Sequence, residues 1–156
     1  MPNIRRVVEL GDYIFMISGK RPIVQQYIVG GFRVAEKISA QLAFNRFPEN
    51  RLRMDGDRLL GNIAVDANGN KHPLDTHSND GFARRAQNYI IGDRPAFVSA
   101  PRAVERARAQ SLQALSEVMR KPIANRAIDM IGRHSKLDDR QVGEMLAWID
   151  RWNAQP

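Results

Sequence analysis

The sequence predicts an α+β fold, with a small, mostly antiparallel β-barrel or curved sheet in residues 1–99, flanked by helices, and a helical C-terminal third over 100–156. Two observations carry this prediction. Residues 11–36 have the pattern of two strands around a basic turn. After Ser99 the period of the apolar residues changes from about two residues, typical of strands, to about 3.6 residues, typical of helices. A chain of 156 residues has the length of one domain, so we expect the helical part to pack on the β part as a single domain.

The two opening strands carry the clearest fold signal. Tyr13, Phe15 and Ile17 alternate only imperfectly with polar residues, so we expect the first strand to be covered on both faces. In the second strand, Gly30 and Gly31 interrupt the strand pattern, which indicates a β-bulge or a close approach of another backbone. A bend of this kind lets a small barrel turn a corner.

Turn-forming residues divide the middle of the chain into short elements. We expect, in order, a helix capped by Ser39 and ended by Pro48, a loop over 49–58, a strand over 59–65 with a hairpin through Asn68-Gly69, an irregular segment over 72–81, and strands over 88–91 and 96–99.

The last third predicts three helices. Apolar residues at helical spacing predict a helix over about 101–121, a short helix over 125–131 with Gly132 as its C-cap, and a last helix from Asp138 or Asp139. Arg108 falls in the apolar stripe of the first of these helices. Its side chain either extends to solvent or forms a paired or ligand-facing guanidinium.

The net charge of +7 is concentrated in one segment. Between Arg84 and Lys136 there are eleven Lys or Arg residues and four Asp or Glu residues, whereas the rest of the chain has thirteen of each. Of the 24 cationic residues, 19 are Arg, whose planar fork suits phosphate and base edges. This distribution favours a polyanionic partner, most commonly nucleic acid, and the alternative is a solvated basic face in an Arg-rich chain.

Several function classes are excluded by what the sequence lacks. With no cysteine there is no disulfide framework, no thiolate metal site and no Cys nucleophile. No apolar run reaches the roughly 18 residues of a spanning helix, and the N-terminus has no signal-peptide core, so we expect a cytoplasmic protein without a membrane partner. The glycine-rich phosphate-loop patterns and the nucleophile elbow of serine hydrolases are also missing.

One loop carries most of the residues that could perform chemistry. His72, Asp75, His77 and Asp80 have a spacing that would permit a mixed-ligand metal site or a general acid–base pair. A helical zinc motif is excluded because HExxH is absent and Pro73 prevents a continuous helix. We therefore predict no metal and no cofactor, and interpret the segment as a structural or ligand-contacting loop.

Most strand aromatics fit a core role, because burying each one contributes roughly 1.5–3 kcal/mol. Tyr27 and Tyr89 are the better ligand candidates, since each hydroxyl group also needs a polar partner.

The order of five segments resembles a bacterial and phage family of nucleotide-modification-associated domains. These segments are PNIRR, GDYIFMISGK, QQYIVGGFRVAEKI, NGNKHPLDTH and NYIIGDRPAFVS, followed by an amphipathic helix, and they span roughly residues 2–120. The family is distantly similar to the PUA, ASCH, EVE and YTH group. The resemblance implies a PUA-like barrel flanked by helices, with a pocket that binds RNA or modified bases.

The resemblance also implies the residues that form this pocket. Arg5 and Arg6 would approach phosphates, Ser18, Gly19 and Lys20 would form a rim, Tyr27 and Arg33 would face the pocket, and His72, Asp75 and His77 would close it. We count Arg84 and Arg85, at the start of the basic segment, among the nucleic-acid-binding residues. The structural alternatives are a charged surface turn, strand packing and local turn hydrogen bonds.

The family pattern has an additional strand before its basic turn, where this chain has Met1-Pro2-Asn3. We therefore expect an open sheet edge that a homodimer or a partner segment completes.

Three function classes follow from the sequence. The first is a module that binds nucleic acid or a modified nucleotide or base, in DNA or RNA modification or phage defence. The second is a protein-interaction or dimerisation module. The third is a nucleotide-modifying enzyme that uses His72, Asp75 and His77. Salt-sensitive binding would favour the first class, a salt-insensitive dimer the second, and turnover that depends on His77 the third.

Overall fold

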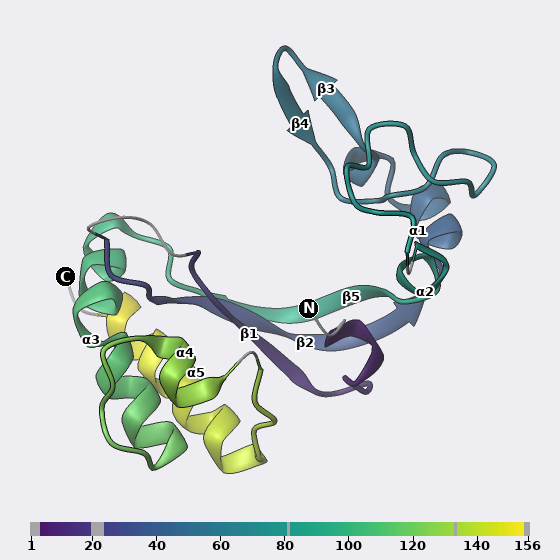
Figure 1. Ribbon diagram of the computed structural model, residues 1–156. Coiled ribbons are helices and arrows are strands. Elements are labelled where there is room, and N and C mark those ends of the chain that lie inside the picture. The colour runs from purple at the N-terminus through teal and green to yellow at the C-terminus, as the bar shows by residue number, and fades with distance from the viewer. Residues whose placement is uncertain (1–3, 20–23, 81, 133, 155–156) are drawn as a thin grey trace. The chain divides into compact units, whose positions relative to one another are not determined.

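Strand β2 (Ile28–Ile38) is the middle strand of a three-stranded sheet in the order β1-β2-β5, where β1 (Tyr13–Ile17) runs antiparallel to it and β5 is Tyr89–Phe97. The computed structural model describes residues 4–19, 24–80, 82–132 and 134–154. Its strands and helices confirm the predicted α+β class and the helical last third (Figure 1). Within the described residues the sheet is open rather than closed into a barrel, and β1 forms one of its edges.

The chain divides into two compact units, and the division falls inside β2 and β5. Of the described residues, unit 1 comprises 11–19, 24–33, 93–132 and 134–154, and unit 2 comprises 4–10, 34–80 and 82–92. Each unit thus combines segments that are distant in the sequence. The predicted organisation, a single domain with a β part over 1–99 and a helical part over 100–156, stays a prediction.

The double glycine in β2 allows a close approach of neighbouring backbone. Gly30 has φ +144°, and a Cβ added there would lie 2.3 Å from the carbonyl oxygen of Ala96. A Cβ on Gly31 would lie 2.6 Å from the carbonyl oxygen of Ile14. The register between β1 and β2 also shifts near the end of β1. The expected bulge and close approach are confirmed, but the expected interruption is wrong, because β2 continues through both glycines.

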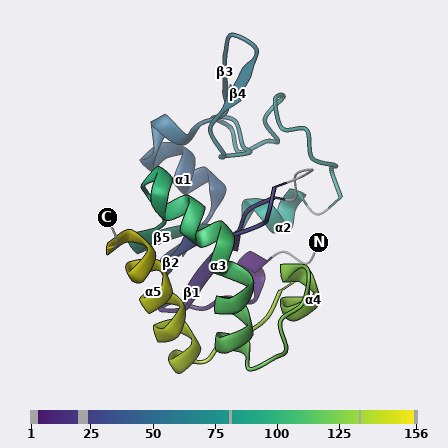
Figure 2. The same ribbon diagram turned by 90° about the vertical axis from the view of Figure 1, so that its left-hand side faces the viewer.

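Unit 1 contains three helices that begin and end close to the predicted positions: α3 (Pro101–Met119), α4 (Ala127–Ile131) and α5 (Asp139–Ala154). α3 packs against both α4 and α5 (Figure 2). Pro at the first position of α3, a left-handed Arg120 after it and Gly132 at φ +63° after α4 explain these limits. The fully buried Ile28 of β2 packs into the same core, which includes Ala107, Leu115, Val118, Met130, Met145, Ile149 and Trp152.

Unit 2 contains short elements around a smaller core. They are η1 (Ile4–Arg6), α1 (Ala40–Arg46), η2 (Pro48–Asn50), β3 (Arg53–Asp55), β4 (Arg58–Leu60) and α2 (Phe82–Ala86). The Ser39 hydroxyl accepts a hydrogen bond from the Leu42 backbone N–H (3.1 Å), as expected of the cap of α1. The core of the unit is formed by Ala40, Ala43, Ile63, Val65 and Tyr89.

Three predictions for this region are wrong. The expected loop over 49–58 contains η2 and β3, because Gly56 at φ +57° allows a tight turn into β4. The strand expected over 59–65 is reduced to the end of β4 and single bridges at Ile63 and Val65. The two strands expected over 88–99 are one strand, β5, because its pairing with β2 overrides the turn signal at 92–95.

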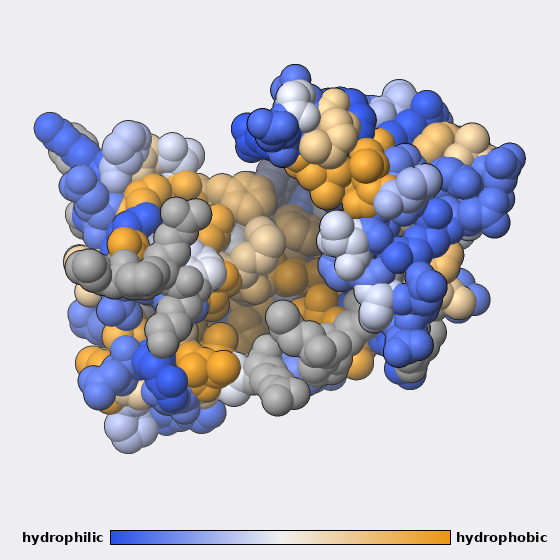
Figure 3. Space-filling view, turned by 45° about the horizontal axis from the view of Figure 1, so that its top comes forward, coloured by the Kyte–Doolittle hydropathy of each residue, from blue (hydrophilic) through white to orange (hydrophobic). Residues whose placement is uncertain are grey.

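Hydrophobic side chains remain on the surface of both units, next to hydrophilic ones (Figure 3). The most exposed are Val7, Leu10 and Ile123, at 62–65%. Single exposed apolar residues are common on soluble domains and do not by themselves mark a binding surface. None of the helices in the described part of the chain combines the length and apolar character needed to span a bilayer.

Candidate functional site

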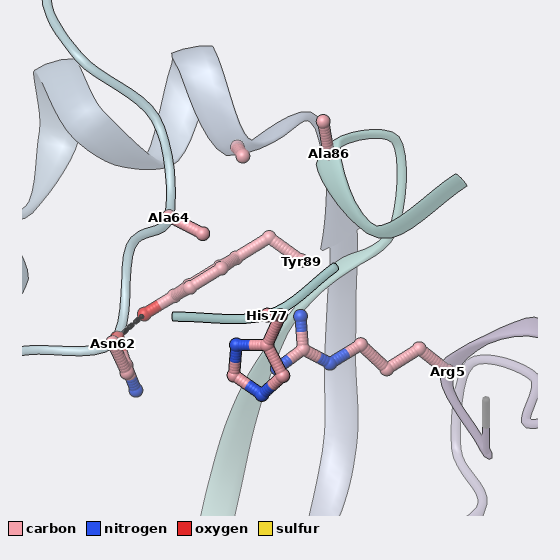
Figure 4. Close-up of a pocket in the computed structure, with 7 residues that line it drawn as sticks. Arg5, Asn62, Ala64, His77, Ala86 and Tyr89 are labelled. Atoms are coloured by element: carbon pink, nitrogen blue, oxygen red, sulfur yellow. Dashed lines mark hydrogen bonds between the residues drawn. The ribbon is translucent and has the colours of Figure 1, made fainter. Parts of the chain in front are cut away.

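A small pocket in unit 2 brings residues from five parts of the sequence together (Figure 4). Its volume is about 90 Å³. The lining residues are Arg5, Ala40, Asn62, Ala64, His77, Ala86 and Tyr89.

Three alanines create the space. Ala40 begins α1, Ala86 ends α2, and Ala64 lies between the bridge residues Ile63 and Val65. A larger side chain at any of these positions would occupy part of the cavity. The small side chains therefore provide an apolar wall between the polar groups.

Tyr89 connects the core of unit 2 to the polar side of the pocket. Tyr89 is 8% exposed, and its hydroxyl donates a hydrogen bond to Asn62 Oδ1 at 2.9 Å. Burial raises the pKa of Tyr89 above its ordinary value, while the hydrogen bond to Asn62 and the charge of Arg5 act in the opposite direction. Because Asn62 Oδ1 accepts this bond, the amide N–H groups of Asn62 are left as donors.

His77 is held by a buried carboxylate. Asp75 Oδ1 lies 2.6 Å from His77 Nδ1, and the Asp75 side chain is 3% exposed whereas the His77 side chain is 70% exposed. The backbone N–H of His77 also donates to Asp75 Oδ1, at 3.2 Å. With Nδ1–H directed to the carboxylate, the ring presents Nε2 to a ligand.

Arg5 lines the pocket and Arg6 does not, although both lie in η1. In Figure 4 the guanidinium of Arg5 and the imidazole of His77 lie on the same side of the Tyr89 ring. The pocket is thus lined by the guanidinium of Arg5, the side-chain amide of Asn62 and the imidazole of His77.

Only some of the predicted site residues belong to this pocket. Arg5 and His77 line it, and Asp75 supports His77. His72 stays in the turn, where its Nδ1 accepts a hydrogen bond from the Leu74 backbone N–H at 3.1 Å. His72 therefore forms a local turn hydrogen bond, which is the structural alternative to a role in the pocket.

The remaining predicted residues lie elsewhere in the chain. Ser18, Gly19 and Tyr27 belong to unit 1, where the Ser18 hydroxyl accepts a hydrogen bond from the Tyr27 N–H at 3.0 Å. Arg33 is engaged by Asp93 through two hydrogen bonds of 2.9 and 2.5 Å. Lys20 lies outside the described residues, and so do the side chains of Arg84 and Arg85 on α2.

Sequence reasoning missed Asn62 and the three alanines. The sequence signal that could have pointed to Asn62 is the glycine directly before it. Gly61 has φ +86°, and a Cβ there would lie 2.2 Å from the carbonyl oxygen of Arg51. The glycine allows this approach and so fixes the backbone from which Asn62 extends. Alanine, in contrast, gives no sequence signal of a cavity.

No group of three or more His, Asp or Glu side chains that could hold a metal ion occurs among residues 4–19, 24–80, 82–132 and 134–154.

Comparisons of the chain with protein-family models, with curated proteins and with solved structures give no match.

Proposed function

We propose that this protein recognises a nucleobase, and specifically a modified base, through the unit 2 pocket. The single observation that carries the proposal is the convergence of Arg5, Asn62, His77 and Tyr89 on one cavity with an alanine wall. A PUA-like relationship, which comes from the sequence resemblance, and a cytoplasmic location, which comes from the lack of a spanning or signal segment in the sequence, are part of the proposal.

The size of the pocket fits part of a base rather than an enclosed nucleotide. Its volume of about 90 Å³ is well below the roughly 300–1,000 Å³ of pockets that surround a drug-sized ligand. It is also smaller than a cavity of about 150 Å³ that is known to hold benzene. The edge of a base and a small substituent such as a methyl group would fit, with the substituent against the alanines.

The polar groups fit the edge of a base. Arg5 and the Asn62 amide can donate to ring nitrogens and carbonyl oxygens, and neutral His77 can accept through Nε2. Because Asn62 and His77 are each fixed by a second residue, their orientation is set before a ligand arrives. The net charge of +7 would add non-specific attraction to the phosphates.

The test is filter binding of short DNA and RNA strands, unmodified or containing N6-methyladenine or 5-methylcytosine, at about 50 and about 200 mM salt. We expect one modified strand to bind more tightly than its unmodified counterpart, and Arg5→Gln to remove this preference. The matched control is Arg6→Gln, which removes the same charge from η1 without changing the pocket lining.

Two results would contradict the proposal. One is that Arg5→Gln and Arg6→Gln lose the same affinity as each other for every strand, modified or not. The net charge of the protein alone would then explain binding. The other is an absence of binding to every strand at the lower salt concentration.

A reaction on the bound base is a second candidate function, and the Asp75–His77 pair favours it. A buried carboxylate that orients an exposed imidazole is the arrangement by which proteins prepare a general base. On this hypothesis His77→Ala abolishes conversion of a modified strand, followed by mass spectrometry, but spares its binding. If the wild-type protein leaves every tested strand unchanged, the second function is excluded for those substrates.

A further inference from the structure

Arg108 on α3 in unit 1 is half-buried, and its guanidinium has no polar partner among the described residues. Its Nε is buried, and no described residue forms a hydrogen bond or an ion pair with the side chain. The guanidinium instead lies over the ring of Tyr27, with the guanidinium carbon 5.1 Å from the ring centroid. Since an unpaired buried N–H is costly, this arrangement calls for an explanation.

Several other arginines of unit 1 are engaged by oxygen atoms. Arg33 is paired with Asp93, Arg126 with Asp129 and Arg140 with Glu144. Arg106, on the same helix as Arg108, donates to the carbonyl oxygen of Trp152 at 2.6 Å. Arg108 differs from these because its partner is an aromatic ring, which leaves the N–H edge of the fork unused.

The backbone at Tyr27, from which the ring extends, is held by hydrogen bonds to Ser18 and Ser111. The Ser18 N–H donates a hydrogen bond to the Tyr27 carbonyl oxygen at 2.8 Å, and the Tyr27 N–H donates one to the Ser18 hydroxyl at 3.0 Å. The next residue, Ile28, donates its N–H to the Ser111 hydroxyl at 2.9 Å. Because Ser111 lies about one turn after Arg108 in α3, the helix that carries the guanidinium also anchors the backbone next to Tyr27.

We propose that Arg108, supported by Tyr27, binds a phosphate group. The guanidinium lies over the Tyr27 ring. Because its Nε is buried, the two terminal Nη groups are the ones that can donate to two oxygen atoms of a phosphate. The charge of unit 1 favours an anion, since the unit contains 14 Lys or Arg residues and nine Asp or Glu residues. None of the residues of this site lines the unit 2 pocket.

The phosphate could belong to a nucleic-acid strand or be free in solution, and both sources offer the same oxygen atoms. The probes are therefore inorganic phosphate and a short unmodified oligothymidine strand, added separately to the full-length protein. The readout is the ¹H–¹⁵N resonance of Arg108 Nε–H, which burial shields from exchange with water and which is assigned through its loss in Arg108→Lys.

We expect a saturable shift of this resonance with at least one probe, and at least about tenfold weaker binding by Arg108→Lys, which keeps the charge but loses the fork. Arg102→Lys, at an exposed position of the same helix, should bind within about twofold of wild type. A response to phosphate alone would identify a site for the free ion, and a response only to the strand would identify a contact with nucleic acid.

The proposal is overturned if neither probe shifts the Arg108 resonance, or if Arg108→Lys binds both probes as well as wild type. The titration of the wild-type protein decides the first point even if a variant is unstable. Arg5→Gln should leave the Arg108 response unchanged, so this site can fail or succeed independently of the unit 2 pocket.

Discussion

The hydroxyl group of Tyr89 determines how Asn62 is presented to the unit 2 pocket. It forms the hydrogen bond between these two residues, and Tyr89 itself is anchored in the core of unit 2. Asp75 does the same for His77. At the scale of single residues, the pocket is thus a set of side chains whose orientation is fixed by a neighbour.

Tyr89→Phe should lower the free energy of unfolding by about 0.5–1.5 kcal/mol, the usual net contribution of one hydrogen bond. Because the bond ends on Asn62, the effect should largely disappear when Asn62 is already Ala. Urea denaturation of both single variants and of the double variant measures this coupling. Strictly additive effects would mean that the hydrogen bond does not form in solution.

A second residue-scale prediction concerns acid stability. The hydrogen bond from Arg33 holds the pKa of Asp93 below its ordinary value of 3.8, and the charge of Arg33 acts in the same direction. Since the folded-state pKa is lowered, this pair stabilises the fold above pH 3.8, and the contribution is lost as the pH falls below that value.

Asp93→Asn should therefore be less stable than wild type near neutral pH, and the difference should shrink on acidification through this range. Thermal unfolding as a function of pH checks the prediction. A constant difference at all pH values would show that the pair does not titrate as described.

Sequence patterns identified some of these residues and not others. Arg5 and His77 stood in segments with a family resemblance, and Tyr89 was recognisable as an aromatic residue whose hydroxyl needs a partner. Asn62 was missed because its role depends on a partner 27 residues away. Arg33 was expected to face a pocket, and its hydrogen bonds to Asp93 could not be predicted because Asp93 lies 60 residues away in the sequence.

At the scale of elements, local signals determined how well the sequence could be interpreted. α3, α4 and α5 carry their own caps and apolar periodicity, so their limits followed from neighbouring residues. β5 was predicted as two pieces because its continuity depends on pairing with β2, which is distant in the sequence. Strands β3 and β4 were too short and polar for a periodic pattern.

The double glycine of β2 gives the clearest prediction at this scale. Gly30→Ala should destabilise the protein by more than about 1 kcal/mol, because φ is positive and the new Cβ would collide with the backbone of Ala96. The matched control is Gly143→Ala in α5, where nothing lies within 4 Å of the added Cβ. Since alanine favours helix over glycine, the control should gain roughly 0.5–1 kcal/mol.

Both variants can be compared by urea denaturation. If both substitutions changed the free energy of unfolding by the same amount, the close packing of β2 against β5 would be contradicted, because replacing any glycine with alanine would then explain the effect.

At the scale of the whole molecule, each compact unit is assembled from two separated segments, and each contains one proposed site. The unit 2 pocket is proposed to read a base, and the Arg108–Tyr27 pair of unit 1 is proposed to hold a phosphate. Composition predicted the basic character on which both proposals draw. It could not indicate which cations are neutralised by carboxylates, because those pairings depend on the fold.

The most direct test of the central claim is a ¹⁵N NMR titration of the protein with the modified strand that binds best in the filter assay. Recognition by the unit 2 pocket predicts shifts of the Asn62 side-chain amide and the His77 ring nitrogens, and their loss in Arg5→Gln but not in Arg6→Gln. If the strand binds while the Asn62 and His77 signals stay unchanged, the pocket is not the site of recognition and the account is wrong.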